Sequence, residues 1–230
     1  MVFKELEIQG FKSFPDKVRI RFDEGVTGVV GPNGSGKTSL IKILTGLIHD
    51  YSGEVLIDGN KPGKVSKAEV AYLPEKTYLA DWMRSIDAIE YMADFYADFD
   101  KEKALRMLEG FQLPPKQKIK TMSKGMQEKL QLLLVMSRNA KLYVLDEPLG
   151  GVDPAAREFI LDTIMMNHPE GSTVLISTHL IYDVEKIFNS VLMIGRGQVL
   201  VKVKTEEITA SGKTIEELFK EVFGHAWQVN

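Results

Sequence analysis

One short segment constrains this chain more than any other. Residues 31–38 read Gly-Pro-Asn-Gly-Ser-Gly-Lys-Thr, which satisfies the pattern G-x-x-x-x-G-K-[ST]. A short apolar run over residues 26–30 precedes the segment, and apolar residues at helical spacing (Leu40, Ile43, Leu44, Leu47) follow it. The order strand, glycine-rich loop, helix is the context in which this pattern binds phosphate. The segment therefore predicts an α/β fold with a nucleotide phosphate-binding loop.

Each part of this loop, which we call the phosphate loop, has a physical task. Its glycines let successive backbone N–H groups turn toward phosphate oxygens, and the helix that starts near Gly36 adds the positive end of its dipole. Lys37 offers a charge to the β and γ phosphates, and the Thr38 hydroxyl can ligate Mg²⁺. The alternative is a glycine-rich turn before an amphipathic helix, but the complete motif favours nucleotide. The expected nucleotide contacts here are Asn33, Gly34, Ser35, Gly36, Lys37, Thr38 and Ser39.

Two adjacent carboxylates follow a second apolar run. Residues 142–145 read as a buried strand that ends in Asp146 and Glu147, and ligands bind at the carboxyl ends of strands in open α/β sheets. Asp146 is the candidate for holding the hydration shell of Mg²⁺, and Glu147 for general base toward the attacking water. A carboxylate pair after a strand is by itself usually a solvated turn. The phosphate loop favours the catalytic interpretation.

A histidine is predicted at the same edge of the sheet. His179 follows a strand over residues 173–176, so its imidazole can bond a γ-phosphate oxygen. Asp153 is an N-cap candidate, with Pro154 at the first helical position.

The rest of the chain reads as one domain built on an α/β core. Residues 2–8 and 18–22 alternate apolar and polar side chains and predict an antiparallel hairpin. Further strands are expected over residues 54–58, 70–73 and 191–194, and helices over residues 85–96, 101–109 and 127–138. We predict a mixed sheet with a parallel core, an antiparallel N-terminal subdomain and a helical subdomain. The expected division of the 1–230 domain is a core of residues 1–74 and 139–204, a helical subdomain of residues 75–138 and a helical tail of residues 205–230.

The composition excludes several classes of protein. The chain has 29 basic and 32 acidic residues, a net charge of −3, which gives no electrostatic reason to expect nucleic acid as a partner. It has no cysteine, so disulfides, thiolate metal sites and cysteine nucleophiles are excluded. No apolar stretch is long enough to cross a membrane, and no signal peptide is recognisable at the N-terminus. We expect a cytoplasmic protein that docks on a membrane partner.

Taken in order, the segments 31–38, 121–127, 142–148 and 150–153 and then His179 resemble the nucleotide-binding domain of ABC transporters. The resemblance extends from about residue 26 onward. It implies an ATPase with ATP and Mg²⁺, in which the signature segment 123–127 opens a helix that caps the γ-phosphate of ATP on the opposite subunit. Ser123 and Gly125 are thus expected to contact nucleotide, although a simple N-cap by Ser123 explains that residue nearly as well. The implied partners are a second ABC ATPase, in a homodimer or heterodimer, and a separate transmembrane subunit.

The chain departs from the family pattern at several positions. Lys124 and Met126 stand where the signature commonly has glycine and glutamine, which is similar to some bacterial exporter ATPases. Glu75 stands where the family has a glutamine. Its carboxylate can still contact the Mg²⁺ shell, so Glu75 is a third metal candidate beside Thr38 and Asp146.

The N-terminus resembles a different family. Residues 6–14 and 25–31 are similar to the head domain of structural-maintenance-of-chromosomes ATPases, which would bring Lys12 near the phosphates. Phe11 or Phe14 could stack on adenine in place of the aromatic residue usual in transporters. One hypothesis is therefore a natural hybrid or an engineered chimera, joined near the phosphate loop.

Three functions compete at this point. The leading one is the ATPase subunit of a membrane exporter, coupled to its partner through residues 78–92, where Trp82 and Met83 either enter a partner groove or belong to the core. A DNA-maintenance head would carry a very long coiled coil between Lys37 and Ser123, and the short span there has no heptads. The third is an engineered or hybrid protein that binds ATP without a physiological partner.

Overall fold

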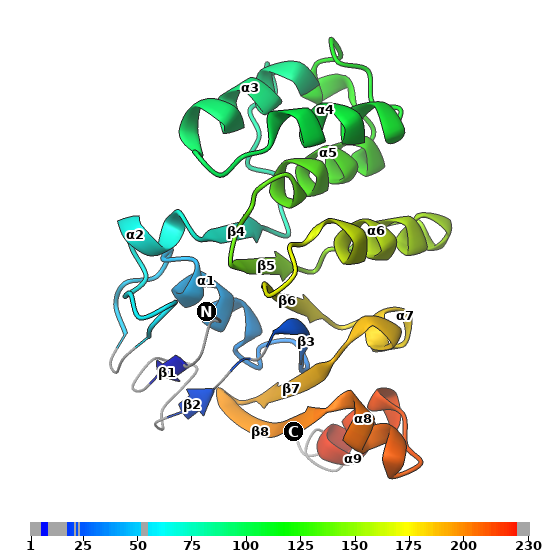
Figure 1. Ribbon diagram of the computed structural model, residues 1–230. Helices are drawn as coiled ribbons and strands as arrows, with labels where there is room; N and C mark the ends of the chain where they lie inside the picture. Colours follow the sequence, from blue (N-terminus) through cyan, green and yellow to red (C-terminus); the bar gives the residue numbers. More distant parts are fainter. Residues whose placement is uncertain (1–5, 9–17, 21, 23, 52–54, 225–230) are drawn as a thin grey trace.

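A six-stranded mixed sheet forms the centre of the molecule (Figure 1). The computed structural model describes residues 6–8, 18–20, 22, 24–51 and 55–224. The strand order is β4-β5-β6-β3-β7-β8, in which the first five run parallel and β8 is antiparallel to β7. The strands are β3 (Gly25–Val30), β4 (Val70–Leu73), β5 (Leu142–Asp146), β6 (Thr173–Thr178), β7 (Ser190–Gly195) and β8 (Gln198–Lys204). The predicted mixed sheet with a parallel core is confirmed.

A separate antiparallel pair consists of β1 (Leu6–Ile8) and β2 (Val18–Ile20). This pairing agrees with the predicted hairpin. The turn between the two strands lies outside the described residues.

The central strands are buried on both faces because each face is covered by helices. Every residue of β5, β6 and β7 is buried, as expected for parallel strands rich in apolar residues. Along β5, Tyr143 and Leu145 belong to one hydrophobic cluster and Leu142 and Val144 to the other. The edge strand β8 instead alternates exposed and half-buried residues.

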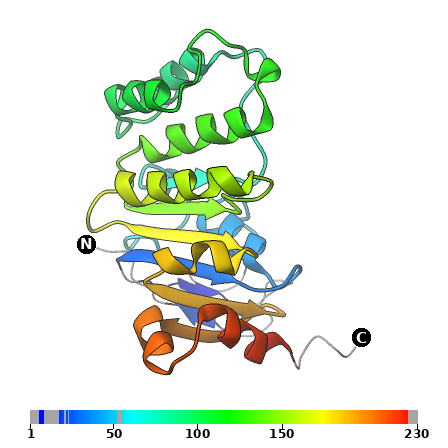
Figure 2. The same ribbon diagram turned by 90° about the vertical axis from the view of Figure 1, so that its right-hand side faces the viewer.

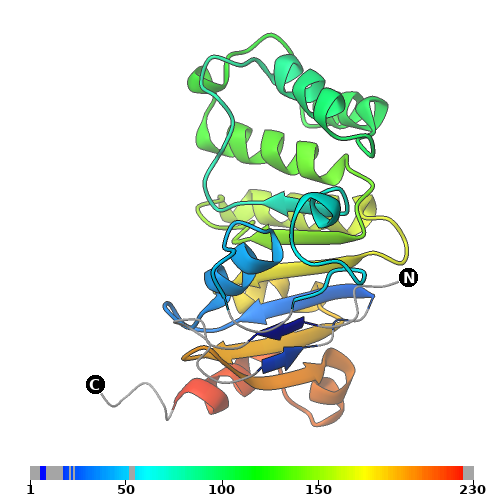
Figure 3. The ribbon, with the colours of Figure 1, turned by 90° about the vertical axis from the view of Figure 1, so that its left-hand side faces the viewer.

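Helices occupy both faces of the sheet and both ends of the molecule. They are α1 (Lys37–Leu44), α2 (Lys64–Lys67), α3 (Ser85–Phe95), α4 (Lys101–Gly110), α5 (Lys124–Met136), α6 (Pro154–Asn167), α7 (Ile181–Val184), α8 (Thr205–Ala210) and α9 (Ile215–Gly224), with 3-10 turns at Ile119–Thr121 and Glu185–Ile187. Figures 2 and 3 show α3 and α4 at one end of the molecule and α8 and α9 at the other. Helix α5 lies between α4 and the sheet, where it contacts β4 and α6. We propose that α3, α4 and α5 form the helical subdomain expected over residues 75–138.

Two local predictions are wrong. No strand forms over the described part of 54–58, because Ile57 and Asn60 exchange backbone hydrogen bonds of 2.7 and 2.9 Å around a turn with positive φ at Asp58 and Gly59. The helix after the phosphate loop ends at Leu44, since Gly46 adopts a φ of +65°. Leu47 is therefore exposed rather than part of the helix's apolar face.

In the part of the chain that the structure describes, no helix has the length and apolar character needed to cross a membrane.

Candidate functional site

The phosphate loop joins β3 to α1 through a backbone that only glycine adopts easily. Gly34 and Gly36 have φ angles of +77° and +110°, in the region that side chains disfavour. A Cβ atom at Gly31 would lie 2.2 Å from the Ile194 backbone oxygen. Gly36 is the N-cap residue of α1 and makes no side-chain hydrogen bond. Its position therefore leaves the first backbone N–H groups of the helix without a side-chain cap. The loop therefore ends in a helix N-terminus suited to an anion.

Lys37 is held over this loop by backbone carbonyls. Its buried ammonium donates hydrogen bonds to the Gly31 oxygen and, at 3.2 Å, to the Pro32 oxygen. Burial lowers the pKa of Lys37, while the charges of Glu147 and Asp146 oppose that shift. A bound anion near Nζ would favour the charged ammonium still further.

Asp146 is the last residue of β5, which lies between β4 and β6 in the sheet. Its carboxylate is buried and accepts a 2.5 Å hydrogen bond from the hydroxyl of Ser177, the residue opposite it on β6. Burial raises the pKa of Asp146, the Ser177 hydrogen bond opposes this, and the charges of Glu147 and Glu75 add to the rise. A cation would therefore bind favourably beside the Asp146 carboxylate, because it would stabilise the charged form.

Glu147 has an unusual backbone conformation, with a φ of +49°. Non-glycine residues rarely adopt such angles, and when they do the site is often functional. Hydrogen bonds to β6 stabilise this conformation. The Glu147 N–H donates to the Ser177 backbone oxygen at 3.0 Å and to the Ser177 hydroxyl oxygen at 3.2 Å. Glu147 Oε2 lies 2.9 Å from His179 Nδ1 and accepts a 3.3 Å bond from the His179 N–H. The sequence predicted both side chains at this edge but not their direct contact.

Most of the predicted site residues line one cavity of about 370 Å³. The sequence had placed Glu75 and Gly150 in separate segments, yet both meet the phosphate loop here. The lining residues are Asn33, Gly34, Ser35, Gly36, Lys37, Thr38, Ser39, Glu75, Glu147, Gly150 and His179. Asp146 lines a small adjoining cavity together with Glu75 and Glu147.

Two predicted nucleotide contacts, Ser123 and Gly125, are not among the residues that line this cavity. Ser123 and Gly125 lie at the start of α5, where the Ser123 hydroxyl accepts a 3.3 Å hydrogen bond from the Met126 N–H as an N-cap. Lys12, like Phe11 and Phe14, lies outside the described residues.

The site residues fit a divalent cation by their chemistry. The Thr38 hydroxyl and the Glu75 carboxylate line the same cavity, and Asp146 is a buried carboxylate at its side. Oxygen ligands of this kind are those that Mg²⁺ prefers.

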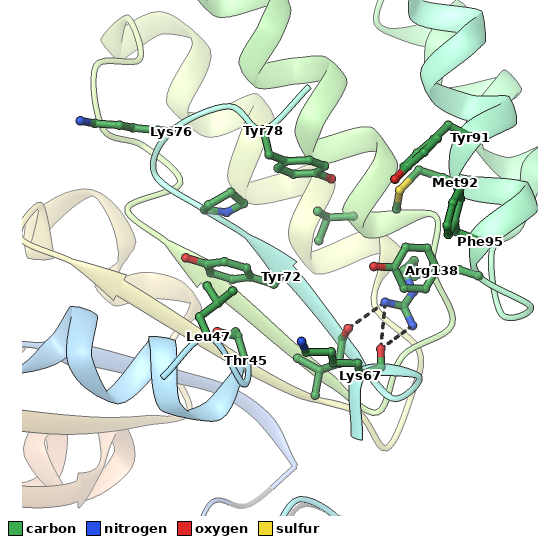
Figure 4. Close-up of a pocket in the computed structure, with 14 residues that line it drawn as sticks. Thr45, Leu47, Lys67, Tyr72, Lys76, Tyr78, Tyr91, Met92, Phe95 and Arg138 are labelled. Atoms are coloured by element: carbon green, nitrogen blue, oxygen red, sulfur yellow. Dashed lines mark hydrogen bonds between the residues drawn. The ribbon is translucent and has the colours of Figure 1, made fainter. Parts of the chain in front are cut away.

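A second, larger cavity was not predicted. We call it the aromatic groove; its volume is about 490 Å³. Figure 4 shows Tyr91 and Phe95 of α3 on one side of it and Thr45 and Leu47, which follow α1, on the other. Its other lining residues are Lys67, Val70, Tyr72, Pro74, Lys76, Tyr78, Met92, Tyr96, Val135 and Arg138.

The structure separates the two residues that the sequence offered for a partner groove. Trp82 is 69% exposed, whereas Met83 is only 8% exposed and belongs to the core. Phe95 at the end of α3 is 68% exposed and lies against Tyr91 with ring centroids 4.5 Å apart. The spacing of Tyr91 and Phe95, four residues apart, was the signal for a second apolar face.

Comparisons with known proteins identify the family. The model of the ABC transporter family matches residues 16–150. An ABC transporter ATP-binding protein of Synechocystis is 29% identical over 210 residues, which cover 87% of this chain and 59% of that protein. One of Methanocaldococcus jannaschii is 30% identical over 216 residues, which cover 91% of this chain and 79% of that protein.

A solved structure, described as the ATP-binding subunit of an ABC transporter, has the same fold. Its TM-score is 0.85 at 23% identity, with 96% of this chain and 99% of that chain covered.

The hypothesis of a hybrid protein finds no support, because each relative named above aligns with 87% or more of the chain. This chain spans somewhat more than half the length of the Synechocystis protein. Since the family model alone covers more than half of its residues, this chain belongs to the ABC transporter family.

Proposed function

We propose that this protein binds and hydrolyses Mg-ATP as the nucleotide-binding subunit of an ABC transporter. The observation that carries the proposal is the single cavity in which the phosphate loop, Lys37, Glu147 and His179 meet. Family membership supports ATP as the nucleotide.

The roles of the side chains follow from their chemistry. Backbone N–H groups of the phosphate loop and the N-terminus of α1 hold the phosphates, and Lys37 exchanges its carbonyl partners for phosphate oxygens. Glu147 takes the proton of the attacking water as general base. His179, 2.9 Å from the Glu147 carboxylate, orients that base and can donate to a γ-phosphate oxygen. Thr38, Glu75 and Asp146 would hold Mg²⁺, which neutralises charge on the phosphates when bound.

We infer that a second subunit completes the site. Ser123 and Gly125 open α5 but do not line the nucleotide cavity of their own chain. In a head-to-tail dimer the partner's α5 N-terminus would face this cavity, where its dipole stabilises the γ-phosphate. The second subunit is another copy of this chain or another ABC ATPase.

The aromatic groove is the surface we assign to a transmembrane partner. Exposed apolar side chains gathered in a concave site mark protein contacts, and Tyr78, Tyr91 and Phe95 are all exposed here. Lys67 and Lys76 line the same groove, which favours a partner segment with apolar side chains and a carboxylate. Such docking would hold the protein at the inner face of the cell membrane.

Steady-state hydrolysis of ATP with Mg²⁺, together with nucleotide affinity, tests the proposal. We expect Glu147→Gln to bind ATP with near wild-type affinity but to hydrolyse it at least about 100-fold more slowly, because the general base is lost. Lys37→Ala should lose affinity, since a buried charge on the phosphates is removed. Lys129→Ala, on α5 outside the cavity, serves as the control and should retain both.

Two other outcomes would change the assignment. Hydrolysis unaffected by Glu147→Gln would remove that residue as the base. Nucleotide binding without hydrolysis, at any protein concentration, would favour the alternative of an ATP-binding protein without catalytic turnover.

A further inference from the structure

A small cavity separates α5 from the segment that carries the predicted general base. Its volume is about 20 Å³, which exceeds the ~10–15 Å³ that one water molecule needs. Glu128 and Gln131 line it from α5, and Asp146, Glu147 and Gly150 line it from the segment after β5. We call it the α5 cavity.

Two buried oxygen atoms on the α5 side have no hydrogen-bond partner among the described residues. They are Oε2 of Glu128 and Oε1 of Gln131, and the Gln131 side chain is only 5% exposed. A buried polar atom without a partner costs about 1–3 kcal/mol, so native proteins satisfy nearly all of them with protein or with ordered water. The two residues are three positions apart on one helix and therefore share a face.

The ion pair of Glu128 with Lys124 does not satisfy these atoms. Lys124 Nζ lies 3.7 Å from the other Glu128 oxygen, Oε1. The Lys124 side chain is packed against Gly151, where an added Cβ would fall 1.9 Å from Nζ. The cavity that both residues line can supply the missing donor for Glu128 Oε2 and Gln131 Oε1.

We propose that one water molecule binds in the α5 cavity and donates its two hydrogens to Glu128 Oε2 and Gln131 Oε1. A water molecule has two donors, which matches the two acceptors. It lies between the helix that begins at Ser123 and the segment that carries Glu147, because Glu147 and Gly150 line the other side of the same cavity. On this ground we assign Glu128 and Gln131 as positioning residues for the general base. The positioning role rests on the proposed ATP hydrolysis, whereas the water site does not.

A crystal structure of the full chain at about 1.5 Å resolution tests the site directly. We expect an ordered water molecule within about 3.2 Å of both oxygen atoms. A cavity without ordered density, or a direct contact of either side chain with a protein donor in place of water, would overturn the proposal.

Kinetics test the positioning role. We expect Glu128→Leu and Gln131→Leu each to lower kcat for ATP about tenfold without changing KM, since a displaced catalytic group slows chemistry and the phosphate loop is unaltered. The double variant should be no slower than either single one, because both act through the same water molecule. Glu128→Gln retains an acceptor oxygen and should keep most of the wild-type kcat.

Controls separate this effect from unfolding. Glu109→Leu replaces an exposed residue of α4 and should leave kcat unchanged, and the melting temperature of each variant reports its folding. Should Gln131→Leu fail to fold, Glu128→Leu against Glu128→Gln gives the same comparison. Multiplicative losses in the double variant, or a Glu128→Gln variant as slow as Glu128→Leu, would contradict a shared water molecule. A wild-type protein without hydrolysis would instead overturn the proposed function, while the crystal structure still decides the water site.

Discussion

Tyr143 is a core residue whose hydroxyl is hydrogen bonded on both sides. It is fully buried, donates to the Arg138 oxygen at 2.6 Å and accepts from the Ala140 N–H at 3.2 Å. These bonds tie the chain that leaves α5 to the second residue of β5. A buried hydroxyl with two hydrogen bonds holds the position of this connecting segment, which apolar packing alone would hold less firmly.

Replacing Tyr143 with phenylalanine should destabilise the protein by about 1–2 kcal/mol at pH 7, because a buried carbonyl and N–H lose their partner. Burial raises the pKa of Tyr143 to about 12, against about 10 in an unfolded chain. Between these values only the unfolded wild-type protein loses the proton, so its stability falls as the pH rises above about 10. The Tyr143→Phe variant has no such hydroxyl to titrate, so the difference in free energy of unfolding between the two proteins should narrow above about pH 10. Urea unfolding of both proteins at pH 8 and pH 10.5 measures this difference, and an equal difference at both pH values would contradict the prediction.

At the scale of elements, Arg138 joins the segment between α3 and α4 to the sheet. Its buried guanidinium pairs with Asp98 at 3.0 Å and donates 2.8 Å bonds to the Ala68 and Val70 oxygens. It also lies 3.9 Å from the ring centroid of Tyr96. Figure 4 shows it within the aromatic groove, bonded to backbone carbonyls. Arg138 thus connects the α3 side of the groove with β4, the strand that leads to Glu75.

We expect Arg138→Met to lower the free energy of unfolding by about 2–4 kcal/mol, because Asp98 and the backbone carbonyls lose their donor. Arg138→Lys should recover only part of this lost stability, since a lysine ammonium cannot replace the several N–H donors of a planar guanidinium. Urea denaturation with a matched control, Arg106→Met, provides the measurement. Arg106 is largely exposed and lies 3.9 Å from Glu102, so its loss should cost less than about 0.5 kcal/mol. Equal effects at the two arginines would show that Arg138 does not hold the groove together.

At the scale of the whole molecule, the proposed dimer depends on the first turn of α5. Among the residues that the structure describes, a Cβ at Gly125 would meet nothing within 4 Å apart from the backbone of its own helix. A side chain there therefore has room within the subunit, so we assign its effect on assembly to the partner subunit or to nucleotide.

Gly125→Asp should therefore leave folding and the monomer's nucleotide binding intact but prevent ATP-dependent dimerisation, since its carboxylate would face the partner's γ-phosphate. Light scattering in the Glu147→Gln background, with Mg-ATP, measures the mass. We expect the Glu147→Gln protein to double its mass on addition of Mg-ATP, and the protein that also carries Gly125→Asp to stay at 25.8 kDa. Gly110→Asp, at another helix position with open space around the added Cβ, is the control and should dimerise. A dimer of the Gly125→Asp variant would exclude α5 from the interface.

Much of the fold and of the site could be predicted because their signals are local. The phosphate loop needs left-handed glycines at Gly34 and Gly36 and a helix directly after them, and these are properties of consecutive residues. Strand ends carry Asp146 and His179 to one edge because parallel strands share a direction. The failures at residues 54–58 and at Leu47 are also local, since turn geometry at Asp58, Gly59 and Gly46 outweighed the apolar spacing.

The sequence by itself determined the phosphate loop, the sheet that carries it and the order of the charged residues around it. Only the tertiary structure decided which side chains touch: the Glu147 contact with His179, the α5 cavity beside Gln131 and the groove around Arg138. Each of these joins elements far apart in the chain. Their separations depend on strand register and on how helices pack against the sheet, and neither is encoded in any one segment.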